Sequence, residues 1–418
     1  MKALSKNLAF VTVAVASLLA AACGSGAVSA PVPQGDQARG DGGAVAKSKF
    51  QALIDRAKAA DGRVRGSIRN YSSEQIRHME QAFERQFGIK ITLEDEPGQP
   101  SRDIPPKVIA AHKAGKGVID YLYGSSPTNI TEALRAGALG KPPWDELMEG
   151  WPIIGELKKL GVKVPGGPNN TTSEESCMFV QNGVWGPAYN KNKIKPEEIK
   201  DLKWDDLLAD KWRGRVILQP DGSGGMSRMP FGKDWPLERV VAWARNLGAN
   251  NPKLVAGGGT AMSTALIQGE GDIVPFLIYD LSYSLVQQGA PIGFAWPEFI
   301  TGSDLITCFP AIPANNPSLA ALFWGWWATD GQYELAAAGY GGARPLFSPE
   351  ADKFPLGKIF KEAGITDLRV AKEKTLEEFG KNASNEQAIT QALKAGVETG
   401  KKVPYPWGCA ANHPSCVR

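Results

Sequence analysis

Residues 204–225 read WDDLLADKWRGRVILQPDGSGG, and this stretch carries the fold prediction. Its two tryptophans and its leucines are expected to pack in a core, while Asp205 and Asp206 cap or solvate a turn. The run at 215–220 is typical of a buried strand. The glycines and serine after it can bring backbone amides and a hydroxyl close to a ligand. The stretch alone leaves open a catalytic site, a phosphate cradle, or one wall of a binding cleft.

The chain opens with a secretory pattern in which lysines precede an apolar run from Leu8 to Ala22, followed by Cys23. The run is shorter than the roughly 20 residues of a spanning helix. We therefore predict that residues 1–22 are a signal peptide. The pattern resembles a bacterial lipoprotein signal, which implies acylation of Cys23; ordinary cleavage after residues 28–30 is the alternative.

Residues 23–47 are rich in glycine, alanine and proline and have no apolar periodicity, so they are expected to form a flexible tether. The remainder of the chain is long enough for two lobes. The formal net charge of +3 is nearly balanced, and no basic block points to a nucleic-acid partner.

The cysteines beyond Cys23 suit an oxidising compartment. Cys409 and Cys416 are predicted to form a local disulfide near the end of the chain, whereas the sequence leaves the pairing of Cys177 with Cys308 undecided. No C-x-x-C motif occurs, so zinc and thiol redox motifs are absent.

Helical and strand patterns alternate along the chain, which predicts an α/β fold. Ser72 or Ser73 is a natural N-cap of a helix, and Gly88 is a natural stop. The predicted helices are 50–62, 72–88, 235–250, 260–271 and 317–339, with short helical turns at 196–210 and further helices between 348 and 400. The predicted strands or extended segments are 89–95, 118–126, 183–190, 215–220, 272–278 and 290–297.

Several blocks in this order are similar to periplasmic solute-binding proteins of ABC importers, with the ferric-iron-type branch nearest. The blocks are FERQFGIKITLED (83–95), AGKGVIDYLYGSS (114–126), VWGPAYNKNKI (184–194), the 204–225 stretch, QQGAPIGFAWPE (287–298) and NNPSLAALFWGWWATDGQ (315–332). The resemblance extends from about residue 50 to 335, and nothing after about Gly339 contributes to it.

The resemblance implies a two-lobed, type II periplasmic-binding-protein-like fold, with mixed sheets flanked by helices and a ligand cleft between the lobes. The expected first lobe comprises 48–182 and 298–338, and the second 183–297. Residues 339–418 are expected to form a helical extension packing on the lobes. The chain would cross between lobes at 183–190 and return at 293–300.

The resemblance also implies that small turns of both lobes face the ligand. The predicted ligand-binding residues are Tyr71, Ser72, Ser73, Ser125, Ser126, Trp185, Ser223, Gly224, Gly225 and Thr260. Tyr279 and Tyr283 are added as candidate ligands because some members of this branch bind ferric iron through tyrosines. The alternative for the serines is that they only cap helices. The alternative for Trp185 is packing in the core or the hinge.

Ferric carriers of this branch use adjacent tyrosines, because phenolate oxygen is a hard donor for a hard cation. Tyr279 and Tyr283 are four residues apart, which places them on one helical face but not adjacent. A small polar or anionic solute is therefore preferred over iron, and neither a metal nor a cofactor is expected.

Motifs of catalysis are missing from the sequence. Asp221 precedes Ser223 where a nucleophile elbow needs glycine, and no Walker, H-E-x-x-H or dinucleotide-binding motif occurs. We predict a monomeric solute receptor, periplasmic or on the cell surface, held by lipid at Cys23 and delivering its ligand to the permease of an ABC transporter. A ferric carrier and, further behind, a surface lipoprotein enzyme are the alternatives.

Overall fold

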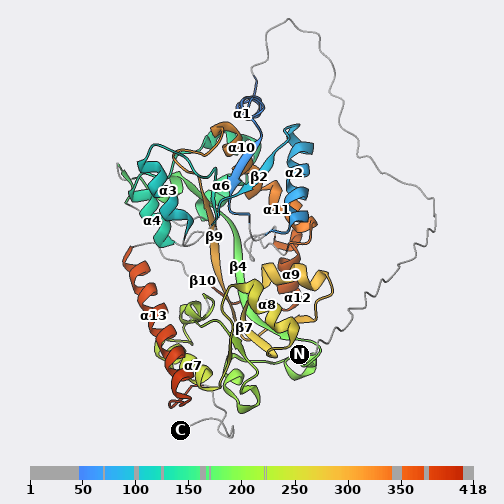
Figure 1. The fold of residues 1–418 in the computed structure, drawn as a ribbon, viewed down its shortest axis with the longest axis vertical. Helices are drawn as coiled ribbons and strands as arrows, with labels where there is room; N and C mark the ends of the chain where they lie inside the picture. Colours follow the sequence, from blue (N-terminus) through green and yellow to red (C-terminus); the bar gives the residue numbers. More distant parts are fainter. Residues whose placement is uncertain are drawn as a thin grey trace, which may run out of the picture. The chain divides into compact units, whose positions relative to one another are not determined.

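The protein is described from a computed structural model that covers residues 47–68, 71–97, 103–123, 127–160, 166–168, 171–220, 222, 224–340, 351–370 and 376–407. The predicted signal peptide, Cys23, nearly all of the tether, and the Cys409–Cys416 pair lie outside these residues. The alternation of helices and strands predicted from the sequence is confirmed (Figure 1).

A six-stranded mixed sheet joins distant parts of the chain, with strand order β10-β9-β4-β7, β3 beside β9 and β8 beside β4. Its strands are β3 (Leu122–Tyr123), β4 (Cys177–Asn190), β7 (Ile273–Ile278), β8 (Ile292–Phe294), β9 (Ile300–Cys308) and β10 (Leu368–Val370). Two small parallel pairs complete the strands: β1 (Arg63–Gly66) with β2 (Thr92–Asp95), and β5 (Ile217–Leu218) with β6 (Lys253–Leu254).

The first lobe is built on α-helices whose apolar faces meet one continuous core. These helices are α1 (Lys49–Ala57), α2 (Ser73–Phe87), α3 (Ile104–Lys113), α4 (Pro127–Arg135), α5 (Trp144–Gly150), α6 (Ile154–Leu160), α10 (Pro317–Ala328) and α11 (Asp330–Ala337). Helix α10 is apolar on every side, and its residues from Leu319 to Ala328 are all buried. Helix α2 starts with a capping box between Ser72 and Gln75 and ends at Gly88 in the left-handed conformation.

The second lobe has cores of its own, to which Trp204, Trp243 and Phe276 contribute. Trp204 stacks on Phe276 with 4.7 Å between ring centroids, which confirms the predicted core role of this tryptophan. The α-helices are α7 (Leu237–Ala249), α8 (Gly259–Gln268), α9 (Tyr279–Gln287), α12 (Pro355–Glu362) and α13 (Leu376–Thr399). Short 3-10 turns in the chain are η2 (Ser173–Glu175), η3 (Pro196–Glu198), η4 (Trp204–Leu208), η5 (Asp210–Trp212), η6 (Met226–Phe231) and η7 (Ala351–Lys353).

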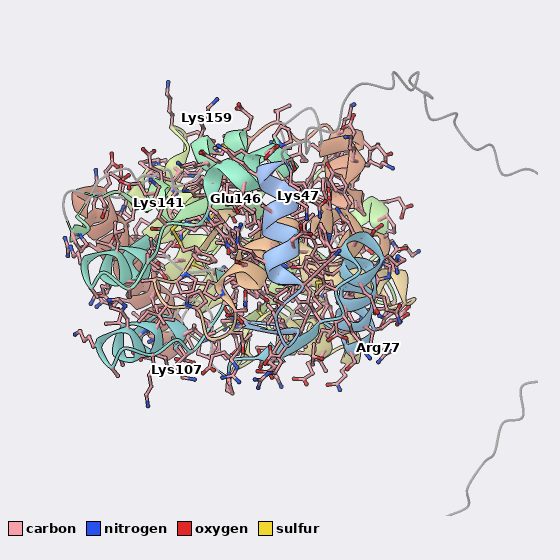
Figure 2. The ribbon with its side chains drawn as sticks, turned by 90° about the horizontal axis from the view of Figure 1, so that it is seen from above. Lys47, Arg77, Lys107, Lys141, Glu146 and Lys159 are labelled. Atoms are coloured by element: carbon pink, nitrogen blue, oxygen red, sulfur yellow. A yellow bond between two sulfur atoms is a disulfide. The ribbon has the colours of Figure 1, made fainter. Side chains whose placement is uncertain are left out.

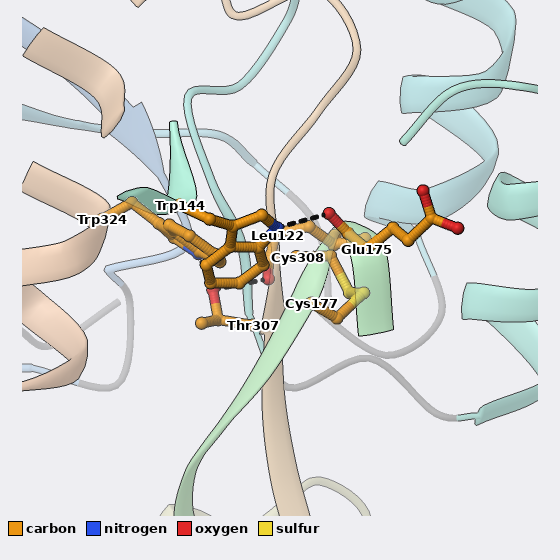
Figure 3. Close-up of a disulfide and its surroundings, with 7 residues drawn as sticks. All are labelled: Leu122, Trp144, Glu175, Cys177, Thr307, Cys308 and Trp324. Carbon is orange, nitrogen blue, oxygen red and sulfur yellow. Dashed lines mark hydrogen bonds between the residues drawn. A yellow bond between two sulfur atoms is a disulfide. The ribbon is translucent and has the colours of Figure 1, made fainter. Parts of the chain in front are cut away.

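Strands β4 and β9 belong to both lobes. They pair antiparallel from Cys177 opposite Cys308 to Trp185 opposite Thr301, with a register shift between Phe179 and Gln181. A disulfide joins Cys177 to Cys308 at the first-lobe end, so the pairing that the sequence left undecided is formed (Figure 3). The sheet beside it is fixed by side chains, because Trp324 donates to Thr307 and Thr307 donates to the Leu122 carbonyl (Figure 3).

The segment after Gly339 packs on both lobes. Helix α13 lies along α7, where a Cβ on Gly396 would be 2.1 Å from the Arg245 carbonyl oxygen, and it also contacts α4 (Figure 1). Helix α12 packs Phe360 against the second-lobe core. The segment is not purely helical as predicted, because β10 pairs with β9 and extends the sheet.

Two further element predictions are wrong in detail. The helix predicted over 317–339 breaks into α10 and α11 at Thr329, whose backbone (φ −120°, ψ −97°) leaves the helical region. The segment 293–300 is not the return crossing. It contains the end of β8, which pairs with Ala188–Asn190 inside the second lobe, and the chain returns along β9 instead.

Basic side chains stand apart from one another on the surface seen in Figure 2, where Lys107 and Lys159 project on opposite sides. Each pairs with a carboxylate, Glu96 and Glu156 respectively, at 2.8 Å. Exposed pairs of this kind contribute little to stability. Of the helices in the described part of the chain, none has the length and apolar character needed to cross a bilayer.

Candidate ligand-binding site

The predicted first-lobe turn contributes one buried aromatic residue and two serines at a helix start. Tyr71 is buried, and its ring meets that of Tyr340 edge to face with centroids 5.2 Å apart. Ser72 accepts the Gln75 backbone N–H as the N-cap of α2, and Ser73 is exposed in the first turn. The capping alternative thus accounts for Ser72. Ser125 and Ser126 lie outside the described residues.

The glycine turn of the 204–225 stretch lies between α13 and Trp185. A Cβ on Gly222 would be 3.7 Å from Thr390 of α13, and one on Gly225 would be 2.8 Å from the Trp185 Cβ. Glycine at 225 is therefore required by close packing. Gly224 also faces the half-buried Trp185, at 3.8 Å from an added Cβ. Ser223 lies outside the described residues, and Thr260 is exposed in the first turn of α8.

Tyr279, which the sequence offers as a ligand residue, lies in the core of the second lobe with its hydroxyl already hydrogen-bonded. Its side chain is fully buried, and its hydroxyl lies 2.9 Å from the Pro187 carbonyl oxygen and 3.0 Å from that of Ala295. Gly186 makes room for it, because a Cβ there would be 2.3 Å from the hydroxyl. Burial raises the pKa of Tyr279 well above its usual value, which opposes the phenolate that a ferric ion needs. Tyr283 is half-buried and packs against the same core.

Where the lobes meet, the structure brings together polar and aromatic side chains that the sequence analysis, Tyr71 apart, did not single out. We call this group the junction cluster. Its members come from six separate segments: Tyr71 before α2, Tyr123 on β3, Gln181 on β4, Asp280 in the first turn of α9, Trp327 on α10 and Tyr340 after α11. All six side chains are buried.

Gln181 connects two of the tyrosines. Its Nε2 donates to the Tyr123 hydroxyl at 2.8 Å and to the Tyr340 hydroxyl at 3.5 Å. The Tyr123 ring also meets Trp327 edge to face, with centroids 4.6 Å apart. The phenol oxygens of Tyr123 and Tyr340 therefore converge on one amide, and aromatic rings stand around it.

Asp280 supplies the carboxylate of the junction cluster and is 2 % exposed. Burial raises the pKa of this carboxyl well above its usual range, opposed by hydrogen bonds from the backbone N–H groups of Val184 and of Asp280 itself. Its charge in turn raises the pKa of Tyr71, Tyr123 and Tyr340, on top of the larger effect of burial. The four groups are thus electrostatically coupled across the two lobes.

Two acceptors of the junction cluster are buried without a hydrogen-bond partner among the described residues: Asp280 Oδ1 and Gln181 Oε1. The indole N–H of Trp327 interacts instead with the Tyr71 hydroxyl and lowers its pKa against the larger effect of burial. Leaving a buried polar atom unpaired costs roughly 1–3 kcal/mol, so native proteins rarely gather several at one place. Two unpaired acceptors within one buried polar cluster make the junction the candidate site for a ligand that donates hydrogen bonds. One available signal was Asp280 itself, which follows the buried strand β7 at the start of a helix.

Comparisons with known proteins bear on the fold. No family model and no curated protein matches the chain. Solved structures do match, among them the substrate-binding protein of an ABC transporter from Agrobacterium tumefaciens, with a TM-score of 0.59 and 13% identity over 79% of this chain and 95% of that one.

Two further solved structures carry different ligand names. A periplasmic binding protein of A. tumefaciens in complex with agropinic acid has a TM-score of 0.54 and 15% identity, covering 81% of this chain and 99% of that one. The spermidine/putrescine transporter substrate-binding protein of Streptococcus pneumoniae has a TM-score of 0.53 and 16% identity, covering 79% and 99%. The chain therefore has the α/β, two-lobed fold of type II periplasmic binding proteins.

Proposed function

We propose that the protein is the extracytoplasmic substrate-binding component of an ABC transporter and that it captures a small polar solute without changing it chemically. The observation that carries this proposal is the set of unpaired, buried polar atoms at the junction of two lobes. The same fold in substrate-binding proteins of transporters supports it.

The mechanism follows from the origin of the contacts. Tyr71, Tyr123, Trp327 and Tyr340 belong to the first lobe, whereas Asp280 belongs to the second. A ligand that contacts both sets stabilises only the closed arrangement, so binding shifts the population toward closure. Exclusion of water then strengthens each polar contact.

The remaining parts of the proposal concern the location and partners of the protein. Residues 1–22 direct export, Cys23 carries the lipid anchor, and the monomeric receptor delivers its ligand to the permease subunits. This reading rests on the sequence pattern of the first 47 residues.

A ferric carrier remains the second candidate, because the junction cluster contains three tyrosines and one carboxylate, and the phenol oxygens of Tyr123 and Tyr340 meet at one amide. Tyr71 is the predicted ligand residue that this candidate retains, since Tyr279 is committed to the core. Iron–phenolate binding would give an absorption band in the visible range on addition of ferric citrate.

The test is a thermal-shift screen of ferric, carboxylate, phosphonate, sugar and amine compounds, followed by small-angle X-ray scattering with each stabilising compound. A true ligand at 100 times its Kd should stabilise the native state by about 2.7 kcal/mol and reduce the radius of gyration. Gln181→Leu should abolish both effects, whereas Gln288→Leu on the surface should change neither. A ligand that stabilises the Gln181→Leu variant equally would place the site elsewhere.

A further inference from the structure

The proposed function leaves the ligand class open, and the junction cluster narrows it. Resting on that function, we propose that the site binds a small organic cation, an ammonium-bearing solute, with Asp280 as its counter-ion and the rings of Tyr71, Tyr123, Tyr340 and Trp327 as its walls. This departs from the polar or anionic solute predicted from the sequence.

The charge of the site favours a cation. Asp280 is buried, which raises the pKa of its carboxyl, and backbone N–H groups of Val184 and Asp280 oppose this by stabilising the ionised form. It takes part in none of the ion pairs formed within the described ranges. An anionic ligand would be repelled by the Asp280 carboxylate in its ionised form. An ammonium group would give the carboxylate the partner that a buried charge requires.

The aromatic rings favour the same class. Tyr71 meets Tyr340 edge to face at 5.2 Å, and Tyr123 meets Trp327 at 4.6 Å, so rings border the site from several elements. The faces of Tyr and Trp rings attract cations through their quadrupoles, and this attraction grows when water is excluded. Aromatic walls around one buried carboxylate are therefore suited to a desolvated ammonium group.

The donors in the site disfavour a bare metal ion. Gln181 presents its N–H group to the phenol oxygens of Tyr123 and Tyr340, and the indole N–H of Trp327 is turned to the Tyr71 hydroxyl. Neither N–H can ligate a metal. Gln181 Oε1 and Asp280 Oδ1 each need a donor. The best ligand therefore carries an ammonium group, whose N–H groups can supply both.

Isothermal titration calorimetry on the purified protein tests this inference with choline, glycine betaine and putrescine as cationic probes. The comparison compounds are 3,3-dimethylbutan-1-ol, which is the neutral isostere of choline, then succinate and ferric citrate. We expect at least one cation to bind saturably. Asp280→Asn should weaken that binding about a hundredfold, because it removes the counter-ion. Asp201→Asn, on an exposed loop, should leave it unchanged.

Two variants of Tyr340 distinguish the contribution of the aromatic ring from that of the phenol oxygen. They also test the inference if Asp280→Asn fails to fold. Tyr340→Phe keeps the aromatic face and should alter cation affinity no more than about threefold, whereas Tyr340→Leu should reduce it at least about tenfold. A metal held by phenolates would instead be lost with either variant and would show a visible tyrosinate band, which would overturn the inference.

The results of these titrations test the cation class separately from the proposed receptor function. Saturable binding of succinate with a reduced radius of gyration would refute the cation class while leaving the receptor function in place. Equal affinity for choline and its neutral isostere would refute the counter-ion role of Asp280. Failure of every probe here and in the thermal-shift screen would count against both proposals.

Discussion

Removal of the Cys177–Cys308 disulfide should cost the protein much of its stability. The two cysteines are separated by 131 positions, and the polypeptide between them forms most of the second lobe. Without the cross-link the unfolded chain gains the freedom of this loop. For a loop of 131 residues the loop-closure relation gives about 5 kcal/mol at 25 °C, a large share of the 5–15 kcal/mol typical of folded proteins.

The assay is urea denaturation of the wild type, Cys177→Ala, Cys308→Ala and the double variant, followed by tryptophan fluorescence and far-UV circular dichroism. We expect each single variant to lose nearly as much free energy of unfolding as the double variant, because either change opens the loop completely. Packing losses would behave differently, since each single variant would remove only one of the two buried side chains.

Two results would refute this reasoning. One is a loss below about 1 kcal/mol in the double variant, which would mean that the cross-link hardly restricts the unfolded chain. The other is a loss in each single variant near half of that in the double variant, which would assign the effect to packing.

Further predictions concern the junction, the C-terminal helix and the second-lobe core. Burial raises the pKa of Asp280 above the ordinary 3.8, so the folded protein holds this proton more tightly than the unfolded chain does. Without ligand, the free energy of unfolding should therefore fall as the pH rises from 3.8 toward the folded pKa, by at most about 1.4 kcal/mol per pH unit. Asp280→Asn should flatten this slope in urea titrations at several pH values, and an unchanged slope would contradict the burial argument. Gly396→Val would place a Cβ against the Arg245 carbonyl, so it should lower the free energy of unfolding by about 1–3 kcal/mol and increase amide hydrogen exchange in α13. Exchange as slow as in the wild type would disprove the close packing of α13 on α7. Trp204→Ala should cost about 3–5 kcal/mol, since the ring is fully buried and its N–H donates to Phe299; a thermal midpoint within about 1 °C of the wild type would be incompatible with that.

Local signals in the sequence were sufficient for some helices, such as α2, and for part of the second-lobe core. Ser72 and Gly88 mark the ends of α2, because a capping side chain and a left-handed glycine act within a few residues. Trp204 is in the core for a similarly local reason, because apolar turn residues and a buried strand lie next to it in the sequence. Alternation of elements then indicates the α/β class.

The junction cluster could not be predicted in the same way. The charge of Asp280 affects the pKa of Tyr71 only because folding brings them together, since they come from distant elements of different lobes. Tyr279 shows the converse problem: the tyrosines of ferric carriers and its spacing from Tyr283 suggested a ligand residue, but the space beside Gly186 directs its hydroxyl to two carbonyls in the core. The direction of a side chain at a strand end depends on such neighbours in space, which the hydrophobic periodicity of the sequence does not reveal.

The register shift between Phe179 and Gln181 has a mechanical consequence. An extra residue on one strand loosens the ladder and allows it to bend there more easily than elsewhere. The bulge is thus immediately beside the amide that donates to Tyr123 and Tyr340. A solute bound as proposed would contact the two connecting strands where their ladder is interrupted, so binding and bending of the strands would involve the same residue, Gln181.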